Sequence, residues 1–245
     1  MRWPALRPSP PEAPAPAWAA LWASLIDLTL VLAVVVVAAD RYAPPQDLPW
    51  KPLTLQAPLG MATRLKFEAA AADPERCRAV LRAGGVRFTE EPARSDGFCR
   101  VANALRLRGG TTPLSPAAPV MTCPEALAYA FWDRHVVQPA ARDVLKTPVV
   151  RVDHYGTYAC RAVAGGETPS QHAYANALDV AGFQTAGGRR VSVAAYFNQA
   201  DPRGGFLHQV RDGACGWFRV VLSPDYNAAH RDHLHLDFSP FALCR

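Results

Sequence analysis

The feature that most constrains this chain is a pair of short polar strings in its last third. The first, SQHAYANALD, runs from Ser170 to Asp179 and places His172 seven residues before the aspartate. The second, DHLH, begins at Asp232 and contains two histidines. Imidazoles and a single carboxylate suit zinc, and three protein ligands leave a fourth coordination position open. Convergence of these groups in space would make the chain a metallohydrolase.

Apolar and polar residues alternate around the second string, which predicts a β-strand with one apolar face and one polar face. The alternating residues are Leu234, Leu236 and Phe238 on one face and His233, His235 and Asp237 on the other. Leu178 and Val180 flank Asp179 in the same way. Each string taken alone is weak, because a structural histidine is the commoner interpretation of an isolated match. The combination, set between apolar residues, carries the argument.

The two strings resemble the superfamily of lysostaphin-type peptidases, zinc D-Ala-D-Ala carboxypeptidases and hedgehog domains. Ser170, His172, Ala177 and Asp179 match its first motif, and Ala175 stands where glycine is usual. The chain is still more similar to the bacterial extensin-like C-terminal family. That resemblance rests on Tyr-Ala-Cys-Arg at 158–161, on the string at 170–179 and on the run at 224–237. It covers roughly Asp73 to the C-terminus.

The resemblance implies a zinc site with His172, Asp179 and His235 as ligands. Asp232 matches the acid that lies three residues before the last ligand and takes the proton of a zinc-bound water, the expected nucleophile. An ideal strand would turn Asp232 and His235 to opposite faces. We therefore expect Asp232 in the loop before the strand.

Four further residues surround this predicted site. His233 shares the base role, binds the oxyanion or is a structural histidine beside the metal. Arg161 binds a substrate carboxylate or the oxyanion, or else forms a surface ion pair. Ser170 is expected to hold the motif loop by a hydrogen bond and to contact the substrate. His230 is the alternative metal ligand if His172 or Asp179 does not bind the ion. The remaining histidines are interpreted as structural: His135, His154 and His208.

The resemblance implies a zinc metallopeptidase or amidase that cleaves peptide bonds of peptidoglycan, of the D,D-carboxypeptidase or endopeptidase type. The alternative is a non-catalytic cell-envelope binding domain with a structural or vestigial zinc site. A fourth protein ligand would favour this alternative. The net charge of +5 comes from scattered arginines, and no basic run interleaved with aromatic residues indicates nucleic acid.

The N-terminal quarter predicts export. We expect residues 1–17 to be a disordered, Pro/Ala-rich N-terminus, 18–39 a transmembrane anchor, 40–60 a Pro-rich linker and 61–245 the zinc-peptidase-like domain. Asp27 interrupts the apolar segment. The cost of inserting this aspartate, about 2.5–3.5 kcal/mol, can be offset by the Leu/Val run that follows. The prediction is a single-pass inner-membrane protein with a periplasmic C-terminal domain; the alternative is secretion after cleavage of a signal sequence.

Six cysteines follow the apolar segment. An even number without a Cys-x-x-Cys pair indicates disulfides in an oxidising compartment rather than a thiolate zinc site. Fifteen pairings are possible. Local spacing favours Cys77–Cys99 and Cys215–Cys244, which leaves Cys123–Cys160.

Helices and strands do not alternate regularly, so the sequence predicts an α+β fold with an antiparallel sheet flanked by helices, preceded by one N-terminal hydrophobic helix. One helix is predicted to begin at Asp73-Pro74 and to end at Gly84-Gly85. Residues 98–107 are predicted to form a strand. Thr122 and Glu125 are predicted to form a capping box that opens another helix.

Overall fold

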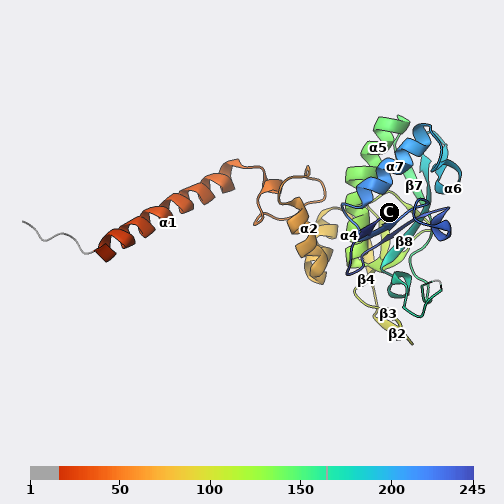
Figure 1. The fold of residues 1–245 in the computed structure, drawn as a ribbon, viewed down its shortest axis with the longest axis horizontal. Coiled ribbons are helices and arrows are strands. Elements are labelled where there is room, and N and C mark those ends of the chain that lie inside the picture. The colour runs from red at the N-terminus through yellow and green to blue at the C-terminus, as the bar shows by residue number, and fades with distance from the viewer. Residues whose placement is uncertain (1–16, 164) are drawn as a thin grey trace, which may run out of the picture.

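The computed structural model describes residues 17–163 and 165–245, so the prediction for residues 1–17 lies outside the described residues except at Ala17. Helix α1 (Ala17–Tyr42) lies apart from the rest of the fold (Figure 1). At its end, Asp40 accepts a hydrogen bond from Trp50 and pairs with Lys51. Within the described residues, no helix is both long enough and apolar enough to cross a lipid bilayer. The anchor over 18–39 stays a prediction.

The rest of the chain mixes short helices with short strands. The remaining α-helices are α2 (Thr63–Ala72), α3 (Pro74–Ala83), α4 (Cys123–Trp132), α5 (Gln138–Ala140), α6 (Val193–Tyr196) and α7 (Pro202–Ala214). Shorter helical turns are η1 (Pro45–Asp47), η2 (Asp133–Val137), η3 (Ala141–Leu145), η4 (Gln171–Tyr174) and η5 (Ala228–His230). Of these, η2 and η3 are π-helical and the others are 3₁₀ turns.

The strands form three sheets, and their order within each sheet differs from their order in the sequence. The long sheet runs β12-β10-β11-β8-β7-β5, with β9 paired to β8; the others are β1-β4-β6 and β2-β3. Most pairs are antiparallel, but β5–β7 and β10–β12 are parallel. The strands of the long sheet are β5 (Leu114–Ser115), β7 (Val149–Gly156), β8 (Ala177–Thr185), β9 (Arg190–Ser192), β10 (Val220–Leu222), β11 (Leu234–Asp237) and β12 (Leu243–Cys244). Those of the smaller sheets are β1 (Arg87–Glu91), β2 (Arg94–Asp96), β3 (Cys99–Val101), β4 (Ala104–Gly109) and β6 (Val120–Thr122). The predicted α+β class is therefore confirmed.

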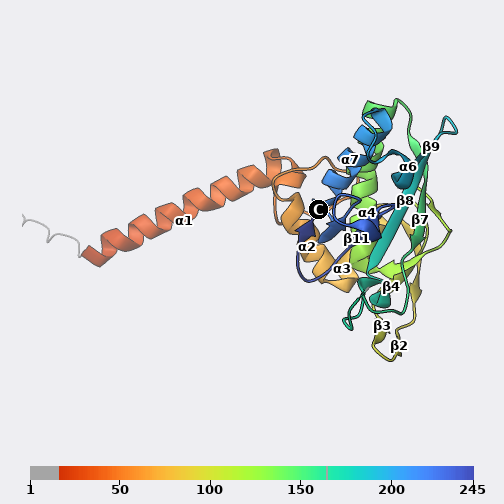
Figure 2. The same ribbon diagram turned by 45° about the vertical axis from the view of Figure 1, so that its right-hand side comes forward.

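The neighbouring strands β8 and β11 bury one face and leave the other partly open. Leu178 and Val180 on β8 join Leu234 and Leu236 on β11 in the main core, which also includes most of α4. Burying each such side chain contributes about 1.5–3 kcal/mol. Both ribbon views place α4 and α7 alongside β8 (Figures 1 and 2). Because side chains alternate along a strand, the opposite face of β8 and β11 is left for polar residues.

Helix ends follow the local sequence, with one exception. Asp73 caps α3 by accepting hydrogen bonds from the backbone N–H groups of Glu75 and Arg76, and α3 ends one residue before the two glycines. Thr122 caps α4 by accepting from the Glu125 N–H. The second half of the predicted capping box is wrong, since the Thr122 N–H donates to the Ala175 carbonyl and the Glu125 carboxylate has no partner.

The strand predicted over residues 98–107 is also wrong as a single element. Asn103 adopts a left-handed conformation (φ 51°), which breaks the extended chain. As a result β3 pairs with β2 in a two-stranded hairpin, whereas β4 joins β1 and β6. The β2–β3 hairpin projects from the lower edge of the molecule in Figure 2.

Three disulfides are present, as the cysteine count predicted, but only one predicted pairing is correct. Cys215–Cys244 forms, whereas the other two bridges join Cys77 to Cys123 and Cys99 to Cys160. The predicted Cys77–Cys99 and Cys123–Cys160 pairs fail because α3 packs against α4 rather than against the β2–β3 hairpin. Nearness in the sequence was a poor guide to nearness in the fold.

Candidate metal centre

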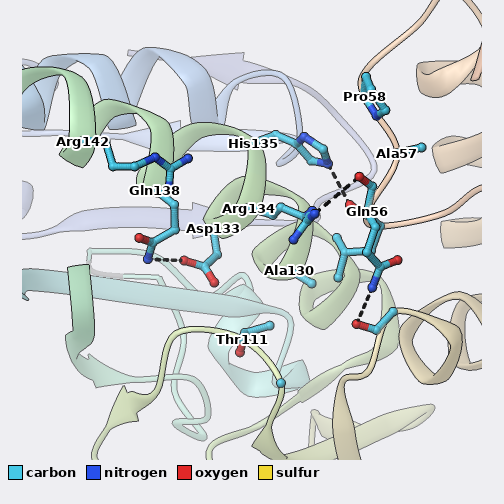
Figure 3. Close-up of a pocket in the computed structure, with 13 residues that line it drawn as sticks. Gln56, Ala57, Pro58, Thr111, Ala130, Asp133, Arg134, His135, Gln138 and Arg142 are labelled. Carbon is cyan, nitrogen blue, oxygen red and sulfur yellow. Dashed lines mark hydrogen bonds between the residues drawn. The ribbon is translucent and has the colours of Figure 1, made fainter. Parts of the chain in front are cut away.

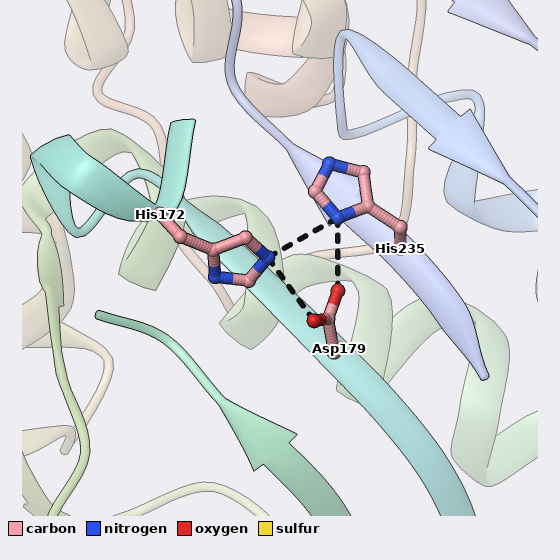
Figure 4. Close-up of side chains that lie close together, drawn as sticks. All are labelled: His172, Asp179 and His235. Carbon is pink, nitrogen blue, oxygen red and sulfur yellow. Dashed lines mark hydrogen bonds and ion pairs between the residues drawn. The ribbon is translucent and has the colours of Figure 1, made fainter. Parts of the chain in front are cut away.

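The two polar strings meet on the open face of the long sheet (Figure 4). Asp179 on β8 and His235 on β11 are directly opposite in the antiparallel register, so their side chains share one face. His172 comes from η4, just before β8. His172 Nε2 lies 3.1 Å from Asp179 Oδ2 and 3.3 Å from His235 Nδ1, and His235 Nδ1 lies 2.8 Å from Asp179 Oδ1.

These distances fit a metal site. Ligand atoms about 2.0–2.1 Å from a tetrahedral zinc lie roughly 3.3 Å from one another, close to the separations observed. Among the described residues, His172, Asp179 and His235 form the group of histidine, cysteine and acidic side chains close enough to hold one ion. The donor set, two imidazoles and a carboxylate, is one that zinc accepts.

The second nitrogen of each imidazole is also held. His172 Nδ1 lies 3.3 Å from the Thr157 carbonyl oxygen, and His235 Nε2 lies 3.1 Å from Asp237 Oδ2. Because these oxygens accept hydrogen bonds, the ring nitrogens facing them carry the protons. His172 Nε2 and His235 Nδ1 are then the atoms available to a metal, in the arrangement that orients histidine ligands in metalloproteins.

The metal-free cluster is strongly polarised. Burial opposes ionisation of Asp179, but hydrogen bonds from His172 and His235 outweigh it and hold the pKa of this carboxyl far below its usual range. Burial likewise disfavours a charged His235, yet its hydrogen bonds to Asp179 and Asp237 raise the pKa of this imidazole to about 9. In the metal-free cluster the positive charge is that of the His235 imidazolium. A metal ion bound at Nδ1 would replace the proton on that nitrogen.

A second pair of side chains lies at the edge of the cluster. Asp232 precedes β11, in the loop where the sequence predicted it. Its Oδ1 accepts a hydrogen bond from His233 Nδ1 at 2.9 Å, and His233 Nε2 lies 3.6 Å from Asp179 Oδ1. The imidazole of His233 therefore stands between the Asp232 carboxylate and the cluster, with Nε2 towards the candidate ligands.

His230 and Arg161 complete the surroundings. The His230 ring lies 5.2 Å from that of His233 and 5.8 Å from that of His235, and its Nδ1 donates to Asn227 Oδ1. Burial, followed by the positive charges of His235 and His233, lowers the pKa of His230 to about 4. The Arg161 charge adds to this lowering, and its guanidinium is exposed.

The loop before β8 is shaped by its own sequence. Ser170 Oγ accepts a hydrogen bond from the His172 N–H and so caps η4, which gives Ser170 the bracing contact that was predicted. The turn ends at Ala175, which has a left-handed conformation (φ 53°). Glycine adopts that conformation without steric cost, which explains the usual residue in the motif. In this chain Ala175 adopts the left-handed conformation instead.

The three histidines interpreted as structural each have a ring nitrogen within hydrogen-bond distance of a backbone carbonyl. The pairs are His135 with Leu55, His154 with Pro116 and His208 with Phe197.

Comparison with known proteins identifies the family. Residues 75–245 match the family described as extensin-like protein C-terminus. The chain belongs to this family. Neither a curated protein nor a solved structure matches it. The matched range contains both polar strings and all six cysteines, so the candidate metal centre lies within the extensin-like domain.

Three residues near this centre of the extensin-like domain were not predicted from the sequence as part of the site. Asp237 follows His235 by two residues on the polar face of β11, a signal that could have identified it as a partner of that imidazole. The carbonyl of Thr157 carries no signal, because any residue supplies one. Glu125 is fully buried on α4, and the charges of Asp237 and Asp179 act on it electrostatically.

Proposed function

We propose that this extensin-like domain is a zinc-dependent peptidase or amidase that cleaves peptide bonds of peptidoglycan. The observation that carries the proposal is the convergence of His172, Asp179 and His235 with the Asp232–His233 pair beside them. Two imidazoles and one carboxylate leave a coordination position for a reacting group. A relationship to the lysostaphin, D-Ala-D-Ala carboxypeptidase and hedgehog superfamily, and to its fold, is part of this proposal.

In this proposal His233 and Asp232 have different roles in the reaction. Bound zinc supplies a Lewis acid for a carbonyl oxygen and makes water more acidic. His233 Nε2 accepts a proton from the attacking water, because Nδ1 is occupied by its hydrogen bond to Asp232. Asp232 orients the imidazole and stabilises its charged form, which refines the role that the resemblance gave to this acid.

Arg161 and Ser170 are proposed to act on the substrate side. The Arg161 guanidinium is exposed, and its charge acts on His230. Within the described residues its side chain donates one long hydrogen bond, of 3.4 Å, to the Ala162 carbonyl. Its planar fork suits a substrate carboxylate or a developing oxyanion. Ser170 acts indirectly, since it holds the turn that carries His172.

The proposed location is the outer side of the inner membrane, with residues 18–39 as the anchor and the domain in the periplasm; secretion after cleavage is the alternative. Three disulfides in one domain support an oxidising compartment. They do not distinguish an anchored protein from a secreted one.

The test is digestion of purified muropeptides by the full chain, with products measured by mass spectrometry. We expect cleavage by the zinc-loaded protein and none after removal of zinc with a chelator or in Asp179→Ala. Asp96→Ala, which removes an exposed carboxylate from β2, is the matched control and should cleave normally. Zinc-loaded protein that cleaves no wall peptide would contradict the proposal.

A specific observation also supports the rival, a binding domain with a closed structural zinc. His233 Nε2 approaches Asp179 closely enough that a small rotation could add a fourth protein ligand. X-ray absorption of the zinc protein separates the two functions. Three protein ligands and one light oxygen atom support the enzyme, whereas three imidazoles and a carboxylate support the binding domain.

A further inference from the structure

Figure 3 shows a cavity that is lined largely by polar residues. It has a volume of about 540 Å³ and lies between the helical segment η2–α5–η3, the loop at Gly110–Thr111 and the chain segment 55–58. No residue of the metal cluster lines it. Residues 55–58 belong to the predicted linker and precede the range matched by the family.

Segment 55–58 is fixed against the domain. Leu55 is buried in the main core, and its carbonyl oxygen accepts a hydrogen bond of 3.0 Å from His135 Nε2. The Gln56 side chain donates to the Gly84 carbonyl. The cavity therefore has a built wall on this side.

A stripe of basic residues forms the opposite wall. Arg134 and Arg142 both line the cavity and are exposed, with Gln138 between them at spacings of four residues. Arg134 makes one long hydrogen bond of 3.4 Å to the Gln56 carbonyl. Arg142 has no hydrogen-bond or ion-pair partner within the part of the chain that the structure describes. Arg134 lies in η2 and Arg142 in η3, two π-helical turns joined by α5, and this geometry is frequent at functional sites.

The other titratable groups that line the cavity are Asp133 and His135. Asp133 is buried, and its two carboxylate oxygens accept hydrogen bonds from the Thr112 backbone N–H at 2.8 Å and hydroxyl at 2.6 Å. Gln138 donates to the same carboxylate. His135 is half-buried, and this burial lowers its pKa, so its imidazole is neutral near pH 7. Burial raises the pKa of Asp133, and the charge of Arg134 opposes that rise. Within the described residues, Arg142 is the cavity-lining charge that has no such partner.

We propose that this cavity binds an acidic peptide segment through carboxylates paired with Arg134 and Arg142. A guanidinium fork matches a carboxylate in two parallel hydrogen bonds. In an extended peptide, side chains on one face recur about every 7 Å, so carboxylates four residues apart lie roughly 13 Å apart. Two carboxylates of such a peptide pair with the two guanidinium groups that line the cavity. The site is separate from the metal cluster and does not depend on the proposed peptidase function.

The test measures binding of fluorescently labelled hexaglutamate to the purified full chain by anisotropy at low salt. Hexaglutamine is the neutral control ligand, and inorganic phosphate is added as a competitor. The variants are Arg134→Gln, Arg142→Gln and the double variant. Arg100→Gln is the matched control, because Arg100 is an exposed arginine on β3 that does not line the cavity.

We expect hexaglutamate to bind about fivefold more weakly to each single variant and at least twentyfold more weakly to the double variant. Arg100→Gln should bind as the unchanged protein does. Thermal unfolding checks that each variant is folded. Equal binding to the double variant, an equal loss in Arg100→Gln, equal binding of hexaglutamine, or displacement by phosphate at the affinity of the peptide would each overturn the proposal.

Discussion

Two polar regions near β8 and β11 differ in whether their side chains have hydrogen-bond partners. On the open face, His172, Asp179 and His235 have a partner for every ring nitrogen and carboxylate oxygen described above. On α4, the Glu125 carboxylate is fully buried, and neither of its oxygens has a hydrogen-bond partner. The first region is a fully paired network, and the second is an isolated buried acid.

The difference shows where charge is supported in this fold. Paired neighbours keep Asp179 ionised despite its burial. Glu125 lacks such neighbours; burial, followed by the negative charges of Asp237 and Asp179, raises the pKa of this carboxyl well above its usual value. The paired network therefore holds an ionised carboxylate, whereas Glu125 is held as a neutral acid.

The largest expected effect comes from breaking the paired network. His172→Ala removes one of three candidate ligands, so zinc affinity should fall by at least about a hundredfold. The loss also leaves buried partners unpaired, which costs about 1–3 kcal/mol of folding free energy. Zinc content by atomic emission and thermal unfolding measure the two effects.

The control for this change is His208→Ala, because the His208 side chain bonds the Phe197 carbonyl outside the cluster. Unchanged zinc content in His172→Ala would remove this residue from the site.

The next effect separates the network from the base beside it. His233→Ala should keep about one zinc per chain but lose about 10²–10⁴ in muropeptide cleavage, the usual contribution of a positioned base. Asp232→Ala should also keep its zinc and lose activity, because the His233 ring loses its orienting partner. Loss of zinc in either variant would instead place that residue among the ligands.

A smaller effect is expected at the isolated acid, where Glu125→Gln should stabilise the protein instead of weakening it. The unfolded chain releases the Glu125 proton near pH 4.5, but the folded protein retains it to higher pH. The free energy of unfolding should therefore fall as pH rises above 4.5, by up to about 1.4 kcal/mol per unit, until the folded-state pKa is reached. Glu125→Gln should remove this slope and be more stable than the unchanged protein at pH 8.

Thermal unfolding of the metal-free protein between pH 5 and 8 tests this expectation. Glu75→Gln, at an exposed glutamate in the first turn of α3, is the control. An identical slope in Glu125→Gln and in the unchanged protein would mean that Glu125 ionises as freely as the acids of the paired network.

The smallest effect is expected at the turn that leads into the network. Ala175→Gly relieves a left-handed alanine but deletes a buried methyl group and adds freedom to the unfolded chain. These terms oppose each other, so stability should change by less than about 1 kcal/mol, with zinc content unchanged. A larger loss, measured by chemical denaturation, would show that the methyl group packs a part of the site.

The sequence allowed prediction of those parts of the site that short-range patterns encode. Alternation along 234–238 placed His235 on the polar face, and the conflict of faces placed Asp232 before the strand. The register that sets His235 opposite Asp179 could not be predicted, because it joins segments 56 residues apart. The pairing of Asp232 with His233 was also missed, since it depends on the rotamers of neighbouring side chains in a loop.

The fold, like the site, could be predicted only where short-range sequence patterns encode it. Capping residues located the starts of α3 and α4, and mixed periodicities indicated the α+β class. The left-handed Asn103, which divides the predicted strand over 98–107, is encoded only weakly by its residue type. The cavity at Arg134 and Arg142 was not predicted, since it needs segment 55–58 to pack on a helix that comes about eighty residues later.

The disulfide pattern has a consequence for how the chain matures. Cys99 lies inside the loop closed by Cys77–Cys123, and its own partner, Cys160, lies outside that loop. Under the proposed export, with the N-terminal part first, Cys77 and Cys99 emerge together before Cys123, so oxidation in order of arrival gives the wrong bond. Correct maturation therefore requires either delayed oxidation or thiol–disulfide exchange. A disulfide isomerase, and not an oxidase alone, should set the yield of folded protein.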